Sequence, residues 1–166
     1  MNNHRNTFLL AALAGGLVLM QFSARAAETP HEESHAHDVA GIAQLQSDDG
    51  RKWPTDASLR AGMASIRSAF EADHAAIHAG SETPAQFETL AGSVEAQVQM
   101  IIRQCQLPPA ADANLHFLIA DLMRGVSRMR GQDPAHTRHD GAALVHGALE
   151  AYGKYFDDPQ WSRGAP

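Results

Sequence analysis

Two helical runs that meet at a double proline decide the fold: FETLAGSVEAQVQMIIRQC (87–105), QLPPAAD (106–112) and ANLHFLIADLMRGVSRM (113–129). On both sides of the prolines, apolar residues recur at steps of three and four, which is the period of an amphipathic helix with one buried face. The repeating residues are Phe87, Leu90, Ala91, Val94, Val98, Ile101, Ile102 and Cys105, then Leu115, Leu118, Ile119, Leu122, Val126 and Met129. We therefore expect two helices packed face to face, with flanking segments that cover them.

The flanking segments supply two more helices. Capping residues mark where the first two of the four expected helices begin: Thr55 or Asp56 before the first, and Thr83-Pro84 before the second, which belongs to the central pair. The expected helices span about 57–78, 84–107, 112–130 and 134–156. Because their connections are short and no strand pattern is present, the sequence predicts an all-α, up-down-up-down four-helix bundle over residues 51–160.

The fourth expected helix carries three internal glycines. Gly141, Gly147 and Gly153 recur at six-residue spacing, and each costs a helix about 1 kcal/mol relative to alanine. Such glycines either allow close contact between helices or leave room for a ligand. Close contact is the commoner reason.

The amino terminus has the pattern of a secretory signal peptide over residues 1–26. His4 and Arg5 precede an apolar run from Phe8 to Phe22, and Ala24-Arg25-Ala26 supplies a small-residue cleavage site. A transmembrane anchor is the alternative, but the apolar run is short for a bilayer span. We expect the mature chain to begin at Ala27, in the periplasm.

Residues 27–50 are rich in histidine and acidic side chains and poor in large apolar ones, so we expect a flexible segment. Its histidines are His31, His35 and His37. Imidazoles and carboxylates this close together can wrap around a divalent cation. The other interpretation is a solubilising linker.

Charge and cysteine content limit the partners. Nineteen acidic residues exceed thirteen lysines and arginines, for a formal net charge of −6. An acidic chain has little reason to bind nucleic acid, or the membrane once the signal is cleaved, which leaves a metal ion or a periplasmic protein as partner. The single cysteine, Cys105, cannot form an internal disulfide, and its spacing places it inward as an inert core thiol.

Candidate metal ligands lie on the edges of the expected apolar stripes. Histidines four residues apart stack on one helix face, and two imidazoles with a carboxylate suit Cu(II), Ni(II) or Zn(II). The candidates are Glu71, His74 and His78 on the first helix, His116 and Met123 on the third, and His139 and His146 on the fourth. A mixed site of His116, Met123 and a histidine from the first or fourth helix would favour Cu(I).

Several stretches resemble a family of small periplasmic proteins of Gram-negative bacteria, the DnrO-like proteins. They are LQSDDGRKWPTDASLRAGMASIR (45–67), IIRQCQLPPAADANLHFLIADLMRG (101–125) and ALEAYGKYFDDPQW (148–161). The resemblance implies a periplasmic four-helix bundle linked to copper or other metal handling. It implies no established activity.

More distantly, the chain resembles the soluble b-type and c′-type cytochromes. Met63 stands where a b-type axial methionine would, but Gly153 takes the place of the axial histidine. The chain also lacks the Cys-x-x-Cys-His attachment of c-type haem. Haem is therefore not an expected cofactor.

No pattern indicates an enzyme: the sequence has no recognisable nucleophile, acid/base pair or phosphate-binding loop. The predicted function is periplasmic metal binding, for buffering, carriage or sensing of copper or another divalent transition metal. The alternatives are a ligand-free interaction or structural bundle and, less favoured, a b-type haem protein with altered ligation.

Overall fold

The computed structural model describes residues 41–161, and all structural statements below concern this range. The signal peptide expected at 1–26, and the part of the histidine-rich segment before residue 41, lie outside it. Four α-helices and a short 3₁₀ helix fill the range without a β-strand, so the all-helical prediction is confirmed. The elements are η2 (Gly41–Gln44), α1 (Ala57–His78), α2 (Pro84–Gln104), α3 (Pro109–Met129) and α4 (Arg138–Tyr155). No helix in this range is both long and apolar enough to cross a membrane.

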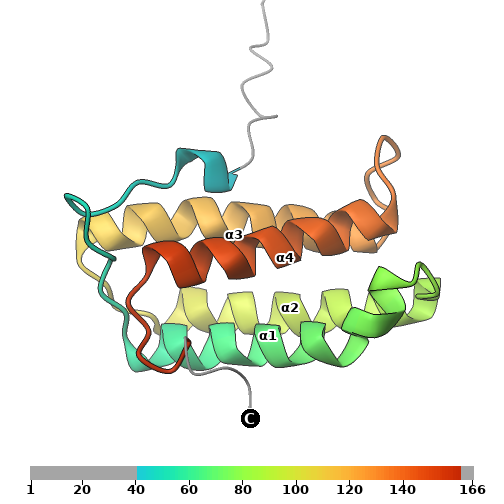
Figure 1. The fold of residues 1–166 in the computed structure, drawn as a ribbon, viewed down its shortest axis with the longest axis horizontal. Coiled ribbons are helices and arrows are strands. Elements are labelled where there is room, and N and C mark those ends of the chain that lie inside the picture. Colours follow the sequence, from blue (N-terminus) through green and yellow to red (C-terminus); the bar gives the residue numbers. More distant parts are fainter. Residues whose placement is uncertain (1–40, 162–166) are drawn as a thin grey trace, which may run out of the picture. The chain divides into compact units, whose positions relative to one another are not determined.

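The four helices form a bundle in which successive helices run in opposite directions (Figure 1). Each helix packs on the next, and α4 returns to lie beside α1. The contact between α3 and α4 is the most extensive, whereas α1 and α4 touch the least of the four neighbouring pairs. The seam between α1 and α4 is therefore where side chains have most room.

Local hydrogen bonds explain where the helices begin. Thr83 and Gln86 form the predicted capping box before α2. A second box, between Thr137 and Asp140, starts α4 at Arg138, so the expected start at Pro134 is wrong by one turn. The third helix begins at Pro109 rather than 112, because a proline fits the first position of a helix, where no amide donor is needed.

The predicted apolar stripes form the core, with two corrections. Ile102 is 62 % exposed and lies outside it. Cys105 is only half-buried, because α2 ends here and the backbone of this residue is extended and no longer helical. Burial and the neighbouring carboxylate of Asp56 raise the pKa of its thiol to about 12, which favours the inert thiol that the sequence indicated.

Residues 41–46, which the sequence assigned to the flexible segment, are packed on the bundle. The amides of Gly41 and Ile42 each donate to the carboxylate of Asp121 on α3, at 2.8 Å. Leu45 is buried, and farther along the backbone of Trp53 bonds to the end of α4. A buried carboxylate thus docks a segment whose composition alone gives little reason to fold.

The glycines of α4 differ in their surroundings. A Cβ on Gly141 would lie 2.5 Å from the backbone nitrogen of Met129, so this glycine serves close contact with α3. Gly153 lies against the indole of Trp161, and a Cβ on Gly147 would meet only the end of the Ile42 side chain. Close contact, the commoner of the two explanations, applies to Gly141.

Asp56 caps α1 and also joins it to the end of α2. Its carboxylate accepts hydrogen bonds from the amides of Leu59, at 2.7 Å, and Gln106, at 2.6 Å. Burial raises the pKa of this carboxyl, but the hydrogen bonds outweigh burial and hold the pKa below its ordinary value of 3.8. A lowered pKa in the folded state means that the carboxylate stabilises the fold above that ordinary value, and that this stabilisation is lost as the pH falls through the folded pKa.

We expect Asp56→Ala to lower the free energy of unfolding by about 1 to 2 kcal/mol at neutral pH, since both amides lose their acceptor. The difference from the wild type should shrink as the pH falls below 3.8, because the carboxyl of the unfolded wild-type chain then takes up a proton that the folded carboxylate, with its lowered pKa, still resists. Urea unfolding at pH 7, 5 and 3 measures this. A difference that stays constant down to pH 3 would show that the charge of Asp56 is not involved.

Candidate metal site

Four of the predicted histidines line one cavity in the seam between α1 and α4. His74 and His78 come from successive turns of α1, and His139 and His146 come from one face of α4, two turns apart. The cavity has a volume of about 250 Å³, and its apolar wall includes Phe70, Ile77, Ala142 and Ala143. The structure therefore brings together two histidine pairs that the sequence could place only on separate helices.

Phe70 contacts two histidines of the cluster. Its ring is buried, and His146 stacks on it with the ring centres 5.4 Å apart. His74 meets the same ring edge-on at 6.1 Å. One core aromatic residue thus contacts an imidazole from each of the two helices.

The imidazoles are near one another but are not in bonding positions for a metal ion. The ring centre of His74 lies 5.9 Å from that of His78 and 6.4 Å from that of His146. Two imidazoles on one tetrahedral ion have ring centres about 5 Å apart, given metal–nitrogen bonds of about 2 Å. No group of three or more His, Cys, Asp or Glu side chains within residues 41–161 is close enough to hold a metal ion as placed.

Small side-chain movements would close this gap. All four histidines are exposed to solvent, so their side chains can change rotamer without disturbing the core. The sparse contact between α1 and α4 leaves room for that movement. To share an ion with His74, the rings of His78 and His146 would have to come about 1 Å closer and turn one nitrogen toward it.

Glu71, the carboxylate predicted to join this site, lies one turn before His74. It forms a loose ion pair with Arg67, with the guanidinium nitrogen 3.7 Å from the carboxylate oxygen. Both residues line a neighbouring cavity that shares His74 and His146 with the histidine cluster. Glu71 therefore adjoins the four histidines without lining the same cavity.

The candidates on α3 lie elsewhere. His116 is exposed, and its Nδ1 is 2.8 Å from the backbone oxygen of Asp112 on its own helix. Met123 packs against the core. Since α3 packs between α2 and α4, the structure does not bring this pair to the cavity between α1 and α4. His31, His35 and His37 lie outside the described residues.

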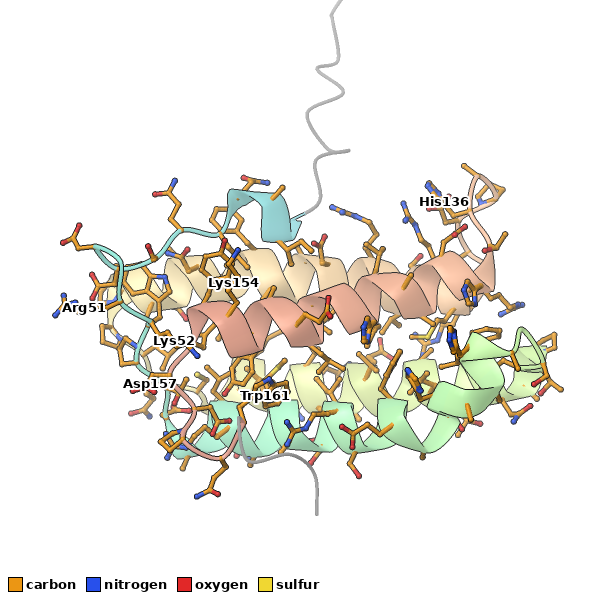
Figure 2. All side chains as sticks on the ribbon, viewed as in Figure 1. Arg51, Lys52, His136, Lys154, Asp157 and Trp161 are labelled. Atoms are coloured by element: carbon orange, nitrogen blue, oxygen red, sulfur yellow. The ribbon has the colours of Figure 1, made fainter. Side chains whose placement is uncertain are left out.

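Sequence reasoning left two neighbours of the cluster out of its list of candidates. Glu150 lies one turn beyond His146 on α4, and this i,i+4 spacing was the available signal. Trp161 follows α4 outside any periodic pattern, so no signal pointed to it. Figure 2 shows Trp161 between α4 and α1, far from His136 in the connection before α4.

The positions that a b-type haem would use are occupied differently. Met63 is fully buried in the core, and the indole of Trp161 fills the space beside Gly153. Within residues 41–161, the chain is a four-helix bundle with an open histidine cluster across its loosest seam. Comparison of the chain with protein-family models, curated proteins and solved structures finds no match.

Proposed function

We propose that this protein is a periplasmic metal-binding bundle that buffers, carries or senses copper or another divalent transition metal. The observation that carries the proposal is the meeting of four histidines in one cavity between α1 and α4. Neutral imidazole is a common ligand of Cu(II), Ni(II) and Zn(II). Exposed histidines and a loose seam favour a site that exchanges its ion over one that keeps it for structure.

The acidic surface supports the same proposal. An excess of carboxylates attracts cations to the protein, and the described part of the chain adds Glu71 and Glu150 beside the cluster. The signal peptide predicted at 1–26 would deliver the chain to the periplasm, and the histidines at 31, 35 and 37 would add a second, weaker chelating segment.

We expect the chain from residue 27 to bind Cu(II), Ni(II) or Zn(II) with a dissociation constant below about 10 μM, which is a binding free energy more negative than about −7 kcal/mol. His74→Ala with His146→Ala should weaken binding by on the order of 100-fold, because one ligand is lost from each helix. Isothermal titration calorimetry measures the affinity, and quenching of Trp161 by Cu(II) in a Trp53→Phe background reports the location.

His116→Ala is the matched control, because this exposed histidine on α3 is remote from the seam. A second chain that lacks residues 27–40 separates the tail from the bundle, and the deletion stops at Gly41 because this residue is docked on Asp121. Binding that disappears with residues 27–40 and survives the histidine substitutions would place the ion in the tail and overturn the bundle site.

A ligand-free interaction or structural bundle is the second candidate. It is favoured by the lack, in residues 41–161, of three donors already close enough for an ion, and by the exposure of Ile102 on α2. Under this interpretation neither chain binds any of the three metals, and the search for a periplasmic protein partner follows.

A further inference from the structure

A second cavity adjoins the histidine cluster along the same seam. It has a volume of about 320 Å³ and shares Phe70, His74 and His146 with the first cavity. Its other polar lining side chains are Arg67, Glu71, Glu150 and Trp161. The two cavities are therefore neighbouring parts of one groove, with all-nitrogen donors at one end and carboxylates at the other.

Each helix offers this second cavity one carboxylate and one imidazole. On α1 the pair is Glu71 and His74, three residues apart, and on α4 it is His146 and Glu150, four residues apart. Residues at these spacings lie on one face of a helix, so the two pairs face the seam from opposite sides.

Neither carboxylate is committed to a strong partner among the described residues. Glu71 is 3.7 Å from Arg67, with its side chain 45 % exposed. Glu150 is 3.5 Å from Nε2 of His146, with its side chain 72 % exposed. Exposed contacts of this kind are weak, so a cation can displace them.

We propose that Glu71, His74, His146 and Glu150, which line one cavity, form a second metal subsite for a divalent cation that accepts oxygen ligands, such as Mn(II) or Zn(II), once their exposed side chains turn toward a common ion. The inference rests on the metal-binding function proposed above and deepens it. Because His74 and His146 belong to both donor sets, one ion occupies either the mixed subsite or the all-histidine subsite.

Ligand chemistry separates the two positions. Carboxylate oxygens suit Mn(II), whereas imidazoles suit Ni(II) and Cu(II), and Zn(II) accepts both. Along the groove, the donors change from His78 and His139 at one end to Glu71 and Glu150 at the other. Two double variants should therefore affect different metals.

The test is to titrate the chain from residue 27 with Mn(II) and, separately, with Ni(II). Binding of Mn(II) is measured by the loss of the electron paramagnetic resonance signal of the free ion, and binding of Ni(II) by calorimetry. Glu71→Gln with Glu150→Gln should weaken Mn(II) binding about tenfold or more and Ni(II) binding less than about threefold. His78→Ala with His139→Ala should show the reverse order. Glu88→Gln, an exposed carboxylate on α2, controls for the loss of general negative charge.

The proposal is overturned if the double glutamine variant weakens Mn(II) no more than the Glu88 control does, or if it weakens both metals equally. Binding of Ni(II) without any binding of Mn(II) or Zn(II) by the wild type would also overturn it, and would leave the proposed function intact. If the wild type binds none of the metals, the proposed function fails and this subsite fails with it.

Discussion

Replacement of Gly141 by alanine is expected to lower the free energy of unfolding by about 2 to 4 kcal/mol. A Cβ at this position would lie 2.5 Å from the backbone nitrogen of Met129 and 2.7 Å from the backbone oxygen of Gly125. Both are backbone atoms of α3, so no side-chain rotation relieves the overlap. The two helices must move apart along the most extensive contact of the bundle.

Gly147→Ala on the same helix is the matched control. There an added Cβ would meet only the end of the Ile42 side chain, at 3.5 Å, which is ordinary van der Waals contact. Because alanine favours a helix over glycine, this variant should be more stable by about 0.5 to 1 kcal/mol. Chemical unfolding of both variants measures the difference, and equal effects at the two positions would contradict close packing at Gly141.

The sequence was sufficient to predict α1, because an aspartate cap and a terminal glycine bracket a clear apolar stripe. It was less successful at the start of α4, where Asp133-Pro134 looked like a helix start. The better signal was the Thr137–Asp140 capping box, which supplies acceptors for two backbone amides. Helix boundaries followed local chemistry wherever the right capping pair was recognised.

The candidate site could be predicted only in parts. Spacing within one helix identified His74 with His78 and His139 with His146, since those residues share a face. Which helix faces meet depends on how α1 and α4 are rotated against each other, and one sequence does not determine that rotation. Trp161 reaches the seam from a segment after α4, where no periodicity applies.

The docking of residues 41–46 was missed for a different reason. Asp121 is a charged residue next to Leu122 in the apolar stripe of α3, and it is fully buried. A carboxylate at a core position requires partners, and the chain supplies them as the amides of Gly41 and Ile42 and the guanidinium of Arg124. A polar residue in an apolar stripe was the available signal that another segment packs there.

Asp121→Ala is accordingly expected to lower the free energy of unfolding by about 3 kcal/mol. The substitution leaves the buried amide of Gly41 and the partly buried amide of Ile42 without an acceptor. It also leaves Arg124 without its ion-pair partner, which lies at 2.8 Å in the wild type. Asp157→Ala is the control, because the hydrogen bonds of Asp157 within residues 41–161 run through its backbone. That variant should change stability by less than about 0.5 kcal/mol.

In Asp121→Ala the loss of stability should begin at η2, because η2 packs mainly on α3 and contributes little to the contacts among the four helices. In native-state hydrogen exchange, the amides of Gly41, Ile42 and Leu45 should lose protection in Asp121→Ala before those of α2 do. Equal loss of protection in both segments would mean that Asp121 supports the whole bundle. Unchanged protection at residues 41–45 would mean that the carboxylate does not dock η2, and that burial of Leu45 alone holds the segment on α3.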